Sequence, residues 1–234
     1  MLQNYTLFNQ PLQAINQPKA LINTLNAHSF NTVQKDEDFH RALLYSDVLL
    51  PDGIGVVWAM RMLTGKKLQK IAGADLFFYE MERVNAFGGK CFFLGSSEET
   101  LKKIRKRAEK EYPKVQVCSY SPPYKPEFND EENKSMIDAI NAEKPDVLFV
   151  GMTAPKQEKW AYQHFEHLVV GHVCCIGAVF DFYAGTVSRA PNWMIQVGLE
   201  WSYRLIKEPR RMWRRYLIGN VKFIGYVVKE KIKV

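Results

Sequence analysis

The sequence has 234 residues, of which 47% are hydrophobic and 24% charged. This composition excludes an intrinsically disordered chain and suits one or two folded domains. The formal net charge is +7, and residues 204–234 hold ten Lys/Arg against two Glu, so the excess lies in that segment and predicts an anionic partner there.

Short apolar runs alternate with amphipathic segments through residues 20–180. The predicted strands are residues 20–22, 47–50, 90–95, 114–118, 146–151 and 173–180. The predicted helices are residues 38–45, 54–63, 98–110, 133–143 and 156–167. Strands that are apolar throughout are typical of a parallel sheet buried on both faces, so we expect a Rossmann-like α/β fold flanked by helices.

The last part of the chain differs from the rest. We expect an α/β domain over residues 1–200 and a basic, amphipathic, helical appendage over residues 201–234. Its apolar residues recur at helical spacing among Lys and Arg, which is typical of a helix lying in a membrane interface. The stripe is formed by Trp213, Leu217, Val221, Ile224 and Val228.

Signals for export or for membrane insertion are missing. The first eleven residues show no basic region followed by an apolar run, so we expect no signal peptide. The longest mostly apolar stretch, residues 168–180, is too short to cross a bilayer. The four cysteines lack CxxC spacing and predict reduced thiols. We therefore expect a cytoplasmic protein with peripheral membrane contact.

Ligands of such sheets bind beyond the carboxyl ends of the strands. The loop at residues 51–55 places Asp52 at a strand end, where a carboxylate can accept a proton from a hydroxyl, and Gly53 would let a ligand approach the backbone. The alternative is that Asp52 caps the following helix. The spacing alone leaves both interpretations open.

Three other strand ends carry candidate residues. Gly95 precedes two serines that open a helix, which either bind a diphosphate or simply cap the helix. Lys156 and Gln157 follow a proline near a helix start, and that helix is otherwise only well capped. Asp181 follows the last strand and is either a ligand group or another cap.

Candidate metal ligands are weak. Residues 36–38, Asp-Glu-Asp, have a spacing by which some enzymes hold a divalent metal, but they open a helix, where acidic residues favour the helix dipole. His164 and His167 lack a third ligand at suitable spacing. We expect no metal site and no cofactor.

Taken in order, these motifs resemble the WecG/TagA/CpsF glycosyltransferase family. The resemblance covers the chain from near residue 20 to near residue 219. The matching segments are residues 24–26, 51–58, 72–76, 93–95, 145–158, 177–182, 189–193, 198–201 and 208–211.

The resemblance implies an inverting, metal-independent transferase. It implies transfer of an N-acetylmannosamine-type sugar (ManNAc or ManNAcA) from UDP to polyprenyl-diphosphate-linked GlcNAc, for teichoic acid, enterobacterial common antigen or capsule. Asp52 then matches the general base, and the polar pocket residues are Thr24, Asn26, Gln157 and Asp181. Basic residues of the appendage are expected to close over the site, which nominates Arg204, Arg211 and Arg214. Self-association into a homo-oligomer is a further expectation from the family.

The chain departs from the family pattern at two places. Lys70 stands where the family commonly has Arg, and lysine cannot reproduce a bidentate guanidinium contact. The family's Gly-Tyr-Phe is replaced by Pro126-Glu127-Phe128, with Tyr120 and Tyr124 upstream in a Pro-rich loop. We include Lys70 and Tyr124 among the substrate-binding candidates.

Two other functions compete with this one. A basic tail with interleaved aromatic residues also suits a nucleic-acid-binding module, although such a module does not need the apolar stripe. A Rossmann enzyme that modifies nucleotide sugars should show GxGxxG near its N-terminus, and the sequence has none there. We therefore expect no nucleic-acid partner.

Overall fold

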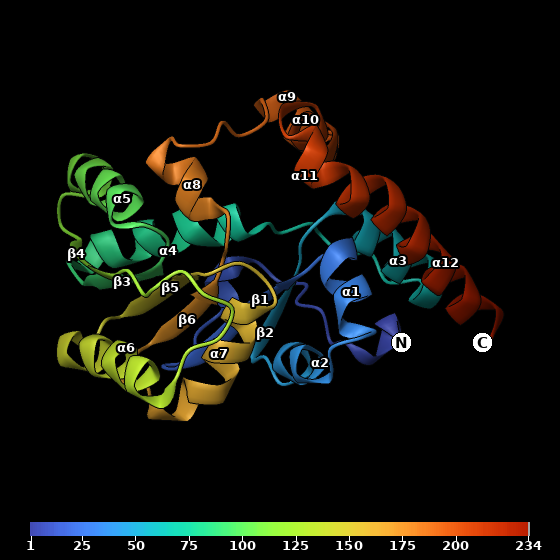
Figure 1. The fold of residues 1–234 in the computed structure, drawn as a ribbon. Coiled ribbons are helices and arrows are strands. Elements are labelled where there is room, and N and C mark those ends of the chain that lie inside the picture. Colours follow the sequence, from blue (N-terminus) through green and yellow to red (C-terminus); the bar gives the residue numbers. More distant parts are fainter. Residues whose placement is uncertain (234) are drawn as a thin grey trace.

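The structure, a computed structural model, describes residues 1–233, apart from the side chains of Asn192 and Gln196. Its centre is one sheet of six parallel strands in the order β2-β1-β6-β5-β3-β4 (Figure 1). The parallel α/β fold is thereby confirmed. The strands are Ala20–Leu25 (β1), Val48–Pro51 (β2), Lys90–Gly95 (β3), Gln116–Tyr120 (β4), Val147–Gly151 (β5) and His172–Cys175 (β6).

The last strand is shorter than the sequence predicts. The predicted strand over residues 173–180 is wrong beyond Cys175, because the chain turns and the helix Val179–Ala184 (α8) begins. Gly177 makes this turn with φ of +53°, in the left-handed region that favours glycine. An apolar run of this length suits a strand or a buried helix equally well, so periodicity could not separate them.

Helices cover both faces of the sheet (Figure 1). Adjacent strand residues point to opposite layers: Ile22 belongs to one apolar core and Leu21 to the other. The first core packs against α8 and two longer helices, Gly73–Phe87 (α4) and Glu98–Glu111 (α5). The second packs against Asp130–Glu143 (α6) and Lys156–His164 (α7). Burial on both sides explains why the strands are apolar throughout.

A third apolar core lies beside the β2 edge of the sheet. Its helices are Ala27–Val33 (α1), Glu37–Leu44 (α2) and Ile54–Thr64 (α3). The sequence did not predict α1 or α4. Helix α1 is rich in His, Ser, Asn, Thr and Val, which are weak helix formers, and it begins where Asn26 caps its first N–H groups.

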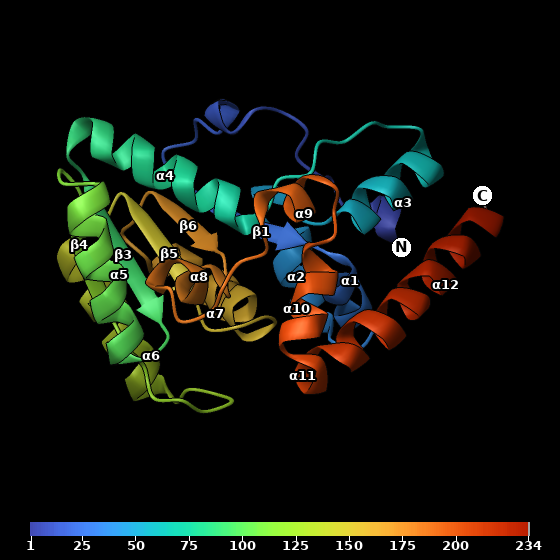
Figure 2. The same ribbon diagram turned by 90° about the horizontal axis from the view of Figure 1, so that it is seen from above.

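The appendage is helical, as predicted. Its elements are Glu200–Lys207 (α10), Pro209–Trp213 (α11), a π-helical turn over Arg214–Ile218 (η4) and Gly219–Ile232 (α12). Figure 2 shows α12 leaving the sheet and running along the same side of the molecule as α3. Phe223 anchors α12, with its ring 5.6 Å from that of Phe30 in an edge-on contact. The division into two domains at residue 200 stays a prediction.

The remaining elements are short. They are the 3-10 turns Leu2–Asn4 (η1), Leu12–Ala14 (η2) and Phe165–His167 (η3), and the helix Asn192–Gln196 (α9). All four cysteines are free thiols, and three of them are buried. Within residues 1–233, no helix has the length and apolar character needed to cross a membrane.

Candidate active site

A cavity of about 930 Å³ lies at the carboxyl ends of β1, β2, β5 and β6. The helices α10, α11 and α12 of the appendage close its other side. Parallel sheets bind their ligands at these carboxyl ends of the strands. The predicted residues that line it are Thr24, Asn26, Asp52, Gly53, Lys70, Gln157, Asp181, Arg204 and Arg211.

Asp52 does not cap the helix that follows it. The N-cap of α3 is Gly53, which has no side chain and adopts φ of +108°. This left-handed turn lets the chain leave β2 and start α3 directly, so the carboxyl of Asp52 stays in the cavity. Of the two interpretations of Asp52, the helix cap is excluded.

Asn26 orients the carboxyl of Asp52. The side-chain oxygen of Asn26 accepts hydrogen bonds from the backbone N–H groups of His28 and Ser29, both at 3.0 Å. This capping contact fixes the amide group beside Asp52, where its hydrogen bonding lowers the pKa of the carboxyl. One side chain thus starts α1 and positions the candidate base.

The environment of Asp52 raises the pKa of its carboxyl to about 6. Burial is the largest cause and the negative charge of Glu200 adds to it, while the hydrogen bond from Asn26 and the charges of Lys70 and Arg215 oppose it. Because this pKa lies just below neutral pH, Asp52 is mainly ionised at pH 7 and yet basic enough to take a proton.

Arginines gather on the appendage side of the cavity. Arg204, Arg211 and Arg215 line it, together with Arg189 from the loop before α9. Among the residues that the structure describes, the Nε atoms of Arg204 and Arg215 are buried without a hydrogen-bond partner, while Nε of Arg189 lies 3.8 Å from Oε1 of Glu200. Burial also lowers the pKa of Arg215, and the nearby guanidinium groups contribute. Unpaired buried donors of this kind are suited to an anion that brings several acceptor oxygens.

The sequence nominated Arg214 rather than Arg215. In the structure Arg214 does not line the cavity, and its guanidinium lies over the exposed ring of Trp213, 5.2 Å from the centroid. Arg215 follows Arg211 by four residues and so shares its helix face. That spacing was present in the sequence and could have identified Arg215.

Glu158 is a cavity residue that sequence reasoning missed. It is buried next to Gln157, whose Nε2 donates to its Oε1 at 2.9 Å. Within the described part of the chain, the other oxygens of the pair, Glu158 Oε2 and Gln157 Oε1, have no partner. Burial raises the pKa of Glu158 to about 7. The pair therefore presents unsatisfied polar atoms to whatever occupies the cavity.

Three other predicted binding residues lie away from the cavity lining. Gly95 acts through its backbone: a side chain there would approach the carbonyl oxygen of Gly151 to 2.7 Å, and its turn brings Ser96 to the cavity. The amine of Lys156 donates to the carbonyl of Lys125 and lies over the ring of Phe128. Tyr124 is fully exposed in the Pro-rich loop.

The acidic segment at residues 36–38 lies at a helix start, as predicted. Asp36 is the N-cap of α2, where it accepts from the N–H of Phe39 at 2.9 Å and pairs with Lys159 at 3.0 Å. Across the residues that the structure describes, no three or more His, Cys, Asp or Glu side chains come together as metal ligands.

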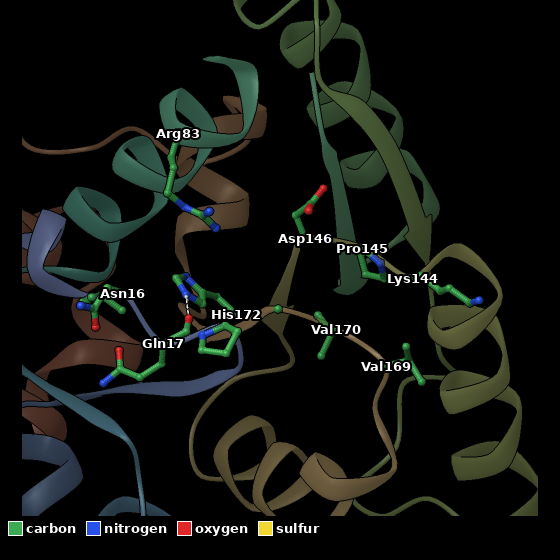
Figure 3. Close-up of a pocket in the computed structure, with 12 residues that line it drawn as sticks. Asn16, Gln17, Arg83, Lys144, Pro145, Asp146, Val169, Val170 and His172 are labelled. Atoms are coloured by element: carbon green, nitrogen blue, oxygen red, sulfur yellow. Dashed lines mark hydrogen bonds between the residues drawn. The ribbon is translucent and has the colours of Figure 1, made fainter. Parts of the chain in front are cut away.

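A second cavity, of about 510 Å³, lies at the opposite side of the sheet, where the strands begin (Figure 3). Two of its lining side chains, Arg83 and His172, are already paired with Glu80. Glu80 accepts from Arg83 and bonds to His172 Nδ1 at 2.8 Å, while His172 Nε2 bonds to the carbonyl of Gln17 at 3.1 Å. These contacts hold the amino ends of the strands together, so the cavity around Asp52 is the better candidate for chemistry.

Comparisons with known proteins agree on one family. The sequence model of the WecG/TagA/CpsF family of glycosyl transferases matches residues 3–234. The Bacillus subtilis (strain 168) protein N-acetylglucosaminyldiphosphoundecaprenol N-acetyl-beta-D-mannosaminyltransferase is 33% identical over 213 residues, which are 91% of this chain and 80% of that protein. Proteins of the same name from Bacillus spizizenii and Staphylococcus aureus (strain MW2) are 32% and 26% identical, over 91% and 90% of this chain and 80% of each relative.

Proposed function

Because this chain belongs to the WecG/TagA/CpsF family, it is a glycosyltransferase, and we propose that it transfers N-acetylmannosamine from UDP to polyprenyl-diphosphate-linked GlcNAc. The names of its relatives support this choice of sugar and acceptor. The strongest support from this chain is one cavity that joins a carboxylate of raised pKa to buried, unpaired arginine donors. A base and an anion clamp are the two elements that the reaction needs.

In the proposed reaction Asp52 takes the proton from the attacking hydroxyl of the acceptor sugar. The freed oxygen attacks the anomeric carbon of the donor from the face opposite UDP. The bond between that carbon and the diphosphate oxygen breaks, and its electron pair leaves with UDP. Direct displacement of this kind inverts the anomeric centre.

The arginines would stabilise the leaving diphosphate. As the bond to UDP breaks, negative charge builds up on its oxygens, and Arg204, Arg211 and Arg215 lie on the side of the cavity that faces Asp52. Fixed cations aimed at developing charge are among the largest contributions to catalysis. We propose that this cluster replaces a metal ion in that role.

The exposed side of the appendage supports membrane contact. All five residues of the predicted apolar stripe are exposed. Lys222 and Lys229 lie on the same helix, and each basic residue near an anionic membrane contributes on the order of 1 kcal/mol. We propose that the protein works at the surface of an anionic membrane, where its lipid-linked acceptor resides.

The test is a transfer assay on the purified protein. UDP-N-acetylmannosamine is incubated with a soluble lipid-diphosphate-GlcNAc analogue in EDTA, and the anomeric configuration of the product is determined by NMR. We expect transfer with inversion that persists in EDTA and is lost in Asp52→Asn. A requirement for a divalent metal, retention of configuration, or full activity of Asp52→Asn would each contradict the mechanism.

A second experiment tests the membrane surface. The intact protein is sedimented with anionic and with neutral liposomes, beside the variant Leu217→Asp/Val221→Asp, in which two exposed side chains of the stripe become charged. We expect binding to anionic liposomes that falls at high salt and is lost in the variant. Equal sedimentation of both proteins would show that the stripe is not the contact.

A further inference from the structure

The cavity around Asp52 changes in character along its length. Near Asp52 it is lined by polar and charged groups, among them Asn26 and the arginine cluster. Toward α3 and α12 its lining becomes almost wholly apolar. The apolar section is formed by Ile54, Gly55, Trp58, Ala59, Met62, Phe223, Ile224, Val227 and Val228.

The apolar section is a groove between two helices that lie side by side at the end of the molecule remote from β4 (Figures 1 and 2). Its floor is buried, with Phe223 and Ala59 each 5% exposed. Its walls are large apolar side chains that remain in contact with solvent. Trp58 and Met62, one helical turn apart on α3, form one wall, and Ile224 and Val228 form the other on α12.

Exposure of these wall residues has no explanation in the folded chain alone. Trp58 is 68% and Ile224 59% exposed, although a buried apolar floor lies between them. An apolar groove that continues from a charged cavity matches a ligand with a charged head and an apolar chain.

We propose that the groove between α3 and α12 binds the first part of the prenyl chain of the lipid-linked acceptor. This inference rests on the proposed function. The acceptor sugar has to reach Asp52, so its diphosphate lies among the arginines and its chain must leave the cavity. The groove is continuous with that cavity and offers apolar contact along the way to the exposed stripe of α12. The groove thus distinguishes lipid-linked acceptors by their chain.

The first experiment compares two acceptors with the same head group. One carries a short alkyl chain and the other a long prenyl chain, both in mixed micelles. We expect Trp58→Ala and Ile224→Asn to raise KM for the long-chain acceptor about tenfold, because apolar contact is lost, and to leave KM for the short-chain acceptor and for the donor within about twofold.

Two control variants separate the groove from general effects. Phe87→Ala removes an aromatic ring of similar exposure at the far end of α4, and neither KM should change. Val221→Asn lies on α12 outside the cavity lining, so it should weaken liposome binding as Ile224→Asn does, without changing the ratio of the two acceptor KM values. The proposal would be overturned if Trp58→Ala raised KM equally for both acceptors. It would also be overturned if Val221→Asn changed the ratio of the two KM values.

The second experiment does not depend on turnover. A prenyl diphosphate that carries a benzophenone in the first part of its chain is irradiated with the intact protein, and the labelled peptides are identified by mass spectrometry. We expect labels in residues 54–62 and 220–228. Labels confined to other segments would refute the groove. If the protein shows no transfer at all, the proposed function fails, and the labelling pattern still decides whether the groove binds prenyl chains.

Discussion

Glu230, near the end of α12, accepts a hydrogen bond from the backbone N–H of Leu2 at 2.7 Å, and its second oxygen accepts from the N–H of Gln3 at 3.0 Å. Glu230 is buried, so the carboxylate satisfies two donors that would otherwise have no partner. This contact and the ring of Phe223 hold α12 against the body of the protein. The wall of the cavity that α12 supplies depends on them.

Replacement of Glu230 should loosen α12. We expect Glu230→Ala to lower the free energy of unfolding by about 1–3 kcal/mol, because a buried and a partly buried N–H group lose their partner. Hydrogen exchange in residues 219–232 should rise, and transfer activity should fall with it. Glu230→Gln, which keeps one acceptor oxygen, should lie between the two proteins. Unchanged exchange in the Ala variant would show that the contact does not anchor the helix.

Asp52→Asn should remove activity and stabilise the fold. Loss of a general base typically costs about 100- to 10,000-fold in rate. The pKa of Asp52 is raised, so its ionised form destabilises the folded state at neutral pH, and an amide avoids that cost. We expect the variant to be more stable by about 1–2 kcal/mol at pH 7.5 and to lose this advantage at pH 4. Denaturant unfolding at both pH values measures this difference in stability. An equal increase in stability at both pH values would show that the charge of Asp52 does not cause it.

The rate should depend on pH through Asp52. Only the ionised carboxyl accepts a proton, so kcat/KM should rise tenfold per pH unit at low pH and level off above about 6. Lys70→Ala removes a positive charge that lowers the pKa of Asp52, so it should move the break in the profile to higher pH. A break near pH 4 in the unaltered protein would assign the titration to a solvated group.

Arg215→Ala should lower kcat much more than Arg214→Ala does, although the two residues are adjacent. Arg215 lines the cavity with a buried, unpaired Nε, and its loss should lower kcat about 100-fold with a soluble acceptor. Arg214 is exposed beside Trp213, and its loss should change kcat less than about threefold in the same assay. A larger loss of kcat in Arg214→Ala than in Arg215→Ala would support Arg214, the residue predicted from the sequence.

Glu158 should make the fold less stable as pH rises. Its pKa is raised from 4.5 to about 7, so the folded state holds the proton more tightly than the unfolded state. The resulting stability is complete below about pH 4.5 and is lost as pH increases through 7. Glu158→Gln should flatten the stability profile between pH 5 and 8, as measured by urea unfolding. A profile unchanged by the substitution would show that Glu158 is not protonated in the fold.

The sheet could be predicted because each strand is a short apolar run that is visible in the local sequence. Continuous apolar runs such as residues 90–95 and 146–151 can be buried only between two helical layers, which leaves few arrangements. Asp52 and Asn26 also follow from position, since parallel strands bring their carboxyl ends to one edge. The C-terminal end of the last strand was predicted wrongly, because the turn at Gly177 interrupts the apolar run and starts a helix.

Glu158 and Arg215 were missed for a different reason. In the sequence Glu158 is an acidic residue in the first turn of a helix, which is the ordinary place for a solvated carboxylate. Only the packing of α7 between the sheet and the cavity makes it buried. The sequence does show that Arg215 shares a helix face with Arg211, but which face meets the cavity depends on how the appendage docks. The burial of Glu158 and the docking of the appendage are tertiary properties.

The cavity is assembled from segments made at different times. A ribosome releases β1, β2 and Asp52 early, and domains begin to fold while synthesis continues. Arg204, Arg211 and Arg215 emerge later, and Glu230 can reach Leu2 only after α12 has been made. A growing chain therefore contains all six strands and Asp52 before it contains the arginine side of the cavity.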